Sequence, residues 1–176
     1  MKNVIPSLYW GFGNTFTYKN WDLDVFIYSQ LGVDKYNDVY SWTSGRGLGN
    51  QTNNMSVYIK DVWHSELNPN GTIPGIAYEM ASVSLPGGAG TDIGYENSSF
   101  VRVRNITLGY NFKPNQLGAL SKLLSGIRVY VDVQNPFTFT GYTGLDPEVN
   151  TGGNYKGGKA EYPQTRTFSL GAKLSF

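Results

Sequence analysis

The last eleven residues of the chain alternate between two kinds of side chain. Phe168, Leu170, Ala172, Leu174 and Phe176 occupy every second position, and the positions between them are small or polar. A period of two residues places the two sets on opposite faces of an extended strand. A strand that is apolar on one face, polar on the other and ends on an aromatic residue is typical of the closing strand of an outer-membrane β-barrel.

The same alternation recurs in four earlier segments, so the sequence predicts five long strands. Their approximate ranges are 7–18, 21–33, 100–112, 127–139 and 166–176. Only Lys19 and Asn20 separate the first two segments. A two-residue hairpin loop makes its flanking residues, here Tyr18 and Trp21, a cross-strand pair on one face. The apolar set changes parity across this turn, as that geometry requires, and the first two strands are predicted to form a hairpin.

The segments that connect the strands alternate in length. The long ones cover 34–98 and 140–164, whereas those after the first and third strands are short. Short periplasmic turns and long external loops are the rule for bacterial outer-membrane barrels. With a periplasmic carboxyl terminus, both long segments would be external loops.

Two connections carry helical patterns. In the first long loop, apolar residues are spaced as on one face of a helix, and we expect a short helix there: Met55, Tyr58, Ile59, Val62 and Trp63. After Pro114, a helical turn ending near Gly126 is indicated by Leu117, Leu120 and Leu124.

A soluble β-sandwich is the alternative to a membrane barrel. Strands of soluble proteins are usually about 5 or 6 residues long, whereas these segments alternate over a much longer range. Arg102 and Arg104 break the apolar alternation of the third strand, and Arg166 begins the last one. In a sandwich core they would be buried charges, whereas at the outer rim of a barrel they would reach water. The pattern therefore favours the barrel.

Five strands are too few for a complete barrel, since the smallest have about eight. The outer strands would leave backbone groups unpaired, which lipid does not tolerate. The fold class predicted is all-β, with five long antiparallel transmembrane strands forming part of a large barrel.

Composition narrows the function further. The 176 residues carry a net charge of +1, which gives no electrostatic reason to expect nucleic-acid binding. The absence of cysteine excludes disulfides and thiolate metal sites. No apolar run approaches the length of a transmembrane helix. Met1–Pro6 contain no apolar signal-peptide core, so the chain is expected to be the tail of a longer protein.

No catalytic constellation, metal site or cofactor site is predicted. His64 is the only histidine and follows Trp63 at the end of the expected helix, which favours a helix-terminal or surface role. Asp146 and Glu148 could be paired carboxylates or calcium ligands, but an Asp-Pro at this spacing more often marks a turn. Loop aromatics can stack on sugar rings or seal against a partner protein. The candidate substrate contacts are Trp42, Trp63, Tyr142, Tyr155, Asp146 and Glu148.

Several segments resemble the carboxyl-terminal end of SusC/RagA-like TonB-dependent outer-membrane transporters. In chain order they are Gly11–Asn20, Ser99–Asn111, Arg128–Asn135, Gly144–Glu148 and Tyr162–Gly171. Asp61-Val-Trp-His64, followed by Asn68-Pro-Asn70, also resembles a loop of this family. The resemblance covers nearly the whole chain. It implies that residues 1–176 are the carboxyl-terminal part of a TonB-dependent receptor β-barrel.

Members of this family have a barrel of about 22 strands filled by a plug, and they import glycans or peptides with energy delivered through TonB. The resemblance implies that this chain supplies the last five strands and their loops. It also implies four partners: a SusD-like surface lipoprotein, TonB through the missing amino-terminal region, the barrel-assembly machinery and outer-membrane lipid. Phe176 would be the assembly signal. The chain is expected in the outer membrane only as part of the full-length protein, and not to be an enzyme.

Two other functions stay open at this point. One is a non-transporting outer-membrane barrel such as an adhesin, and the other is a soluble carbohydrate-binding β-sandwich with aromatic loops. A two-layer globule that buries Phe12, Ile27, Leu108, Val131 and Leu170 together would favour the sandwich.

Overall fold

A computed structural model describes residues 2–37, 56–72, 94–149 and 162–176. The chain divides into two compact units. The sheet unit comprises residues 6–32, 99–141 and 164–176, and the loop unit comprises residues 1–5, 33–98 and 142–163.

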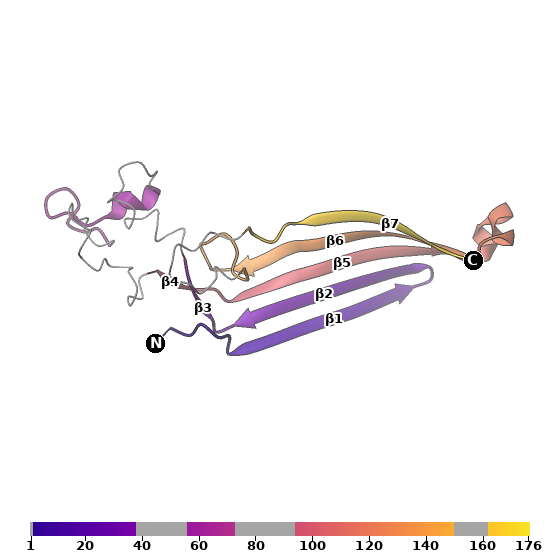
Figure 1. The fold of residues 1–176 in the computed structure, drawn as a ribbon, viewed down its shortest axis with the longest axis horizontal. Helices are drawn as coiled ribbons and strands as arrows, with labels where there is room; N and C mark the ends of the chain where they lie inside the picture. The colour runs from indigo at the N-terminus through magenta and orange to yellow at the C-terminus, as the bar shows by residue number, and fades with distance from the viewer. Residues whose placement is uncertain (1, 38–55, 73–93, 150–161) are drawn as a thin grey trace. The chain divides into compact units, whose positions relative to one another are not determined.

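The sheet unit is a five-stranded antiparallel sheet in which each long strand lies beside the next long strand of the chain (Figure 1). Its order is β1 (Leu8–Tyr18), β2 (Trp21–Leu31), β5 (Phe100–Phe112), β6 (Gly126–Thr140) and β7 (Thr167–Ser175). The five predicted antiparallel strands are therefore present. β2 ends at Leu31 rather than at Val33, because Gly32 turns the backbone with a φ of 67°.

The hairpin between β1 and β2 has the predicted two-residue turn. Tyr18 lies directly opposite Trp21, and Lys19 adopts a φ of 57° in the left-handed region. The pairing then continues without interruption to Leu8 opposite Leu31. Turn length and side-chain pattern therefore specify the same register.

Cross-strand register sorts the side chains into rows that run across the sheet. Directly opposite residues share a face, and one row crosses all five strands through Phe16, Leu23, Leu108, Val131 and Leu170. We call the side that carries this row the apolar face. The neighbouring row on the other side consists of Thr15, Asp24, Thr107, Asp132 and Ser169. That side is the polar face.

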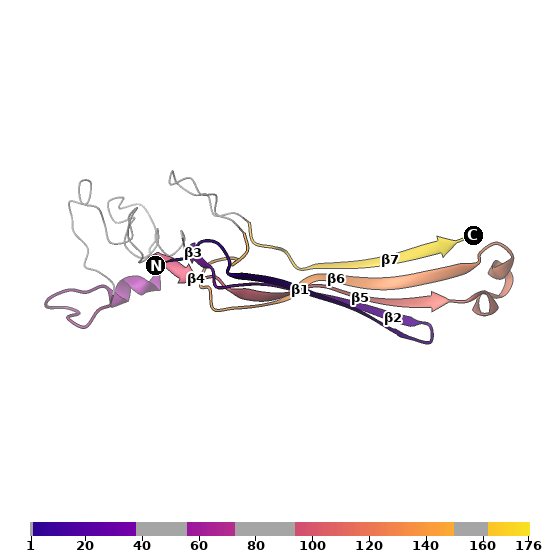
Figure 2. The same ribbon diagram turned by 90° about the horizontal axis from the view of Figure 1, so that it is seen from below.

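The sheet unit is a single layer of strands when seen from its edge (Figure 2). Side chains of the apolar row are open to the surroundings, since Phe16 is 56% exposed and Leu170 is 77% exposed. In a sandwich these side chains would form the core between two layers. The β-sandwich interpretation is therefore wrong.

A β-bulge in β5 corrects the sequence analysis of the arginines. Phe26 pairs with Asn105 and Ile27 with Val103, so Arg104 is an extra residue between them. One extra residue moves everything that precedes it to the opposite face. Val101 and Val103 therefore join the apolar face, and Arg102 lies on the polar face opposite Tyr28. Arg102 does not break the alternation, because the alternation changes parity at Arg104.

The loop unit contains a short antiparallel pair, β3 (Asp34–Tyr36) with β4 (Tyr95–Asn97). The expected helix is present as a five-residue 3-10 helix, η2 (Val57–Asp61), that ends before Val62 and Trp63. It stops there because Asn68 bonds the backbone groups that would form the next hydrogen bond of a longer helix. The Lys60 carbonyl accepts from the Asn68 side chain at 3.2 Å, and the His64 N–H donates to the Asn68 carbonyl at 3.0 Å. Met55 lies outside the described residues.

The turn predicted after Pro114 is also helical. It forms two 3-10 segments, η3 (Pro114–Gln116) and η4 (Gly118–Lys122), in the β5–β6 connection. Among the described residues, no helix combines the length and the apolar character needed to cross a bilayer.

Deletion of Arg104 from the full-length protein is expected to destabilise the sheet no more than Arg104→Ala does. Without the extra residue, Val103 directly precedes Asn105, so Val101 and Val103 stay on the apolar face and Arg102 stays on the polar face. Urea unfolding in phospholipid vesicles measures both variants. A much lower unfolding midpoint for the deletion than for the alanine variant would show that Arg104 is not the extra residue of the bulge.

Candidate functional site

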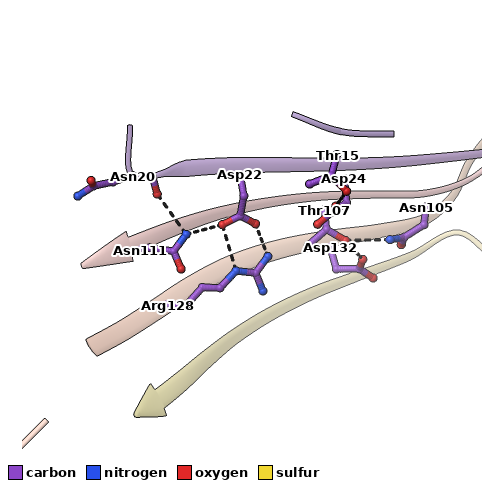
Figure 3. Close-up of polar contacts among 9 residues, drawn as sticks. All are labelled: Thr15, Asn20, Asp22, Asp24, Asn105, Thr107, Asn111, Arg128 and Asp132. Atoms are coloured by element: carbon purple, nitrogen blue, oxygen red, sulfur yellow. Dashed lines mark hydrogen bonds and ion pairs between the residues drawn. The ribbon is translucent and has the colours of Figure 1, made fainter. Parts of the chain in front are cut away.

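An ion pair crosses the polar face over an intervening strand. Asp22 on β2 and Arg128 on β6 approach each other above β5 (Figure 3). The Arg128 Nε donates to Asp22 Oδ1 at 3.2 Å, and its Nη2 donates to Oδ2. Asn111 on β5 donates to the same Oδ1 at 2.5 Å. Three adjacent strands are therefore linked by side chains as well as by their backbones.

Glycine makes this crossing possible. Gly109 lies opposite Asp22 on β5, beneath the ion pair. A Cβ atom there would lie 2.5 Å from Asp22 Oδ2 and 2.7 Å from Arg128 Nε. Any side chain at this position would therefore displace the two charged groups from each other.

A second glycine extends the network to the last strand. The Tyr130 ring lies over Gly171, where a Cβ atom would overlap the ring. The Arg128 guanidinium lies 5.1 Å from the centre of the same ring, within the range of a cation–π interaction. The contacts thus run from β2 through β6 to β7.

The neighbouring polar row holds two more carboxylates. Asp24 accepts a hydrogen bond from Thr15 at 2.5 Å, and Asp132 accepts one from Thr107 at 2.6 Å. Asn105 donates to the Thr107 hydroxyl at 2.8 Å (Figure 3). Ionised carboxylates require water or a polar surface opposite them. The polar face can therefore line a hydrated space or contact a polar protein surface, but it cannot face hydrocarbon.

Asp146 and Tyr142 have structural contacts within the loop unit. The Asp146 carboxylate accepts from the backbone N–H of Glu148 at 2.8 Å and of Val149 at 3.3 Å, so this Asp-Pro segment is a turn. The Lys35 ammonium donates to the Asp146 carbonyl at 3.0 Å and lies 5.5 Å from the centre of the Tyr142 ring. Both Tyr142 and Asp146 are buried. Within the described residues, no cluster of three or more potential ligand side chains could hold a metal ion.

Glu96 on β4 holds the start of the same loop, a role that the sequence analysis missed. Its carboxylate accepts from the Thr143 backbone N–H at 3.0 Å and from the Asn37 side chain at 2.9 Å. Lys35, Asn37 and Glu96 therefore join three segments that lie far apart in the sequence. Only the pairing of β3 with β4 brings them together, so no local pattern could have revealed them.

The tryptophan-containing loop is held by its histidine and an asparagine. The His64 Nδ1 accepts from the N–H groups of Glu66 at 3.2 Å and Leu67 at 3.1 Å. The Asn68 side chain donates to the Val62 carbonyl at 3.1 Å. His64 thus supports a turn at the surface, in agreement with the role expected for it. Trp63, beside it, is 48% exposed.

The predicted substrate contacts are only partly described. Tyr142, Asp146 and Glu148 share one loop, and Trp63 offers an accessible ring in another. Trp42 and Tyr155 lie outside the described residues. Contact of any of these side chains with substrate stays a prediction. The Asp22–Arg128 network was missed because its partners are recognisable only once the strand register is known.

Comparison with known proteins supplies relatives of this chain. No protein-family model matches it. The TonB-dependent receptor SusC of Bacteroides thetaiotaomicron is 33% identical over 168 residues, which cover 94% of this chain and 15% of the receptor. The TonB-dependent receptor P3 of Formosa agariphila is 31% identical over 179 residues, covering 97% of this chain and 16% of that protein.

Comparison with solved structures finds the same kind of protein by its fold. A chain in the structure of the RagAB peptide importer in its closed-closed state superposes with a TM-score of 0.77 at 25% identity, covering 99% of this chain and 18% of that one. This chain thus spans less than a fifth of the proteins that it matches. They are named as receptors and an importer, not as enzymes. By sequence and fold together, the chain belongs to the SusC/RagA-like TonB-dependent receptors.

Proposed function

We propose that this chain forms the carboxyl-terminal part of the barrel wall of a TonB-dependent outer-membrane transporter and acts only within the complete barrel. The observation that carries this proposal is the single-layer sheet, with an apolar row on one face and a row of carboxylates and hydroxyls on the other. Such a sheet meets two different surroundings at once, as a barrel wall does. The apolar face would contact lipid, and the polar face would line the interior.

The edges of the sheet support its continuation into a larger barrel. β1 and β7 are its outermost strands, and within the described residues no further strand pairs with their outer edges. Unpaired backbone N–H and C=O groups each cost several kcal/mol in hydrocarbon. Neighbouring strands from the rest of the transporter would pair with both edges. Barrel-assembly machinery would insert the complete wall into the outer membrane.

The lengths of the connections support an orientation for the wall. The short β1–β2 and β5–β6 connections would face the periplasm, and the long segments 34–98 and 140–164 would be external. External loops can contact both the cargo and a SusD-like surface lipoprotein that closes the barrel. TonB would act on a part of the transporter outside this chain.

The proposed cargo is a glycan or another oligomeric nutrient. The exposed Trp63 ring supports this, because aromatic side chains offer a flat apolar face with a polar edge for sugar rings. The RagAB structure is described as a peptide importer. A peptide is accordingly the alternative cargo.

Arginine substitutions on the two faces of β7 are expected to have opposite outcomes. Leu170 and Ser169 are adjacent in the chain, yet Leu170 belongs to the apolar row and Ser169 to the polar row. Leu170→Arg in the complete transporter should lower its stability by about 2–4 kcal/mol near mid-depth, whereas Ser169→Arg should leave it nearly unchanged. Urea unfolding in lipid vesicles and the amount inserted in cells measure both. A greater loss with Ser169→Arg would reverse the assignment of the faces.

Removal of the Phe176 ring is expected to impair insertion. Phe176 is exposed and continues the apolar alternation of β7. Phe176→Ala in the complete transporter should lower the amount in the outer membrane several-fold, while Phe176→Tyr, which keeps an aromatic ring, should retain most of it. Quantitative immunoblotting of outer-membrane fractions gives the result. Wild-type amounts of the alanine variant would count against Phe176 as the assembly signal.

Substitution of Trp63 tests both the cargo and the transport itself. Loss of one stacking ring, about 1 kcal/mol, should weaken the apparent affinity for glycan in cell uptake assays about fivefold. Leu67→Ala is the control, since Leu67 is exposed in the same loop. Equal uptake by the Trp63→Ala variant and the control would remove Trp63 from the substrate path. A protein that takes up neither glycan nor peptide while binding cells or surfaces would be an adhesin.

A further inference from the structure

The β5–β6 connection differs from an ordinary tight turn because it is helical and rich in leucine. Residues 113–125 form η3 and η4 beyond the ends of the two strands (Figure 1). The N–H of Leu120 donates to the Leu117 carbonyl at 3.1 Å, and that of Leu123 donates to the Leu120 carbonyl at 3.0 Å. Leu117 separates the two segments, and Gly118, with a φ of 56°, begins η4. The connection is therefore a folded element.

Two of its leucines present an apolar surface. Side chains three residues apart eclipse one another on a 3-10 helix, so Leu120 in η4 and Leu123, the residue directly after η4, lie on the same side of this turn. They are 55% and 73% exposed, whereas the adjacent Leu124 is buried. Removing an exposed leucine side chain from water is favourable. Two neighbouring leucines on one side of a turn therefore favour an apolar environment.

The connection that carries these leucines adjoins the apolar face of the sheet. The last apolar row, formed by Phe112, Ile127 and Leu174, adjoins the connection directly. Within the connection, the Gln116 side chain donates to the Tyr110 hydroxyl at 3.2 Å and accepts from Asn20 at 2.8 Å. Tyr110 belongs to the apolar row that also contains Trp21. The connection is thus tied by hydrogen bonds to the side of the sheet proposed to face lipid.

Aromatic rings mark the same end of the sheet as a membrane interface. Tyr110 packs edge-to-face against Trp21, with ring centres 4.8 Å apart, and against Phe112, with ring centres 4.7 Å apart. Aromatic side chains with one apolar and one polar end prefer the boundary between hydrocarbon and headgroups. Leu120 and Leu123 follow these aromatic residues in the chain, in the connection beyond the end of β5.

The charge of the connection complements a phospholipid surface. Residues 113–125 contain Lys113 and Lys122, both exposed, and no aspartate or glutamate. Basic residues are attracted to an anionic lipid surface. Apolar side chains flanked by lysine are typical of segments that lie in the headgroup region.

We infer that the β5–β6 connection is an interfacial anchor that binds the phospholipid leaflet at the short-turn side of the barrel. Leu120 and Leu123 enter the boundary between headgroups and acyl chains, and Lys113 and Lys122 contact lipid phosphates. This inference rests on the proposed function, because it requires the apolar face to lie in a bilayer. It goes beyond that function by assigning a lipid-binding role to a connection outside the strands.

Site-specific fluorescence tests the anchor in the complete transporter. The chain contains no cysteine, so in a cysteine-free transporter single cysteines at Leu120 and Leu123 can carry an environment-sensitive fluorophore. The protein is reconstituted in vesicles of phosphatidylethanolamine and phosphatidylglycerol that contain lipids spin-labelled near the headgroup. Both positions should show blue-shifted emission and quenching at least about twofold stronger than a cysteine at Ser121. Ser121 is the control because it lies on another side of the same helical turn.

A third position separates failure of the anchor from failure of the barrel wall. A fluorophore at Val131, in the middle of the apolar row, should be quenched by lipids spin-labelled deep in the acyl chain. If Val131 is not quenched, the proposed function itself is wrong. If Val131 is quenched while Leu120 and Leu123 behave like Ser121, the wall is correct and the anchor is overturned. Cross-linking of Leu123 to a protein in cells, without lipid quenching in vesicles, would also overturn it in favour of a protein partner.

Discussion

The hydrogen-bonded register between strands is the constraint on which the rest of the molecule depends. Backbone pairing aligns five strands, and the period of two then sends each side chain to one of two incompatible surroundings. A shift of one residue in β2 or β6 would place charged side chains on the apolar face and apolar side chains on the polar face. The bulge at Arg104 changes the register of β5 by one residue. Arg104 takes no position in the pairing with β2, so Val101 and Val103 lie on the apolar face while Arg102 lies on the polar face.

The polar face is held together by side chains that span more than one strand. Asp22 reaches Arg128 over Gly109, and Arg128 lies beside Tyr130, whose ring lies over Gly171. Glycine at these positions leaves room for side chains that come from other strands. A hydrated interior weakens isolated ion pairs, but here the same carboxylate also accepts from Asn111. The network therefore adds lateral connections to a sheet that has no second layer to pack against.

The two kinds of connection perform different tasks. In the loop unit, Lys35 and Glu96 use their charges to hold the segment that contains Tyr142 and Asp146. Side chains with such contacts within the protein are less available to a ligand than the exposed Trp63. At the other connection, the side chains of Leu120 and Leu123 are exposed. On the proposed function, the long loops would serve recognition and the short connection would serve the membrane.

The sequence by itself determined the number of long strands, the hairpin at Lys19-Asn20 and the apolar set of each strand, except for Val101 and Val103 before the bulge in β5. These follow from alternation and turn length, which are local properties. Only the tertiary structure decided the face of Arg102, the pairing of Asp22 with Arg128 and the contacts of Glu96. Each of these depends on which residues become neighbours across strands that are distant in the chain. The helix expected through Trp63 ends at Asp61 for the same reason, since Asn68 takes the hydrogen bonds that a longer helix would need.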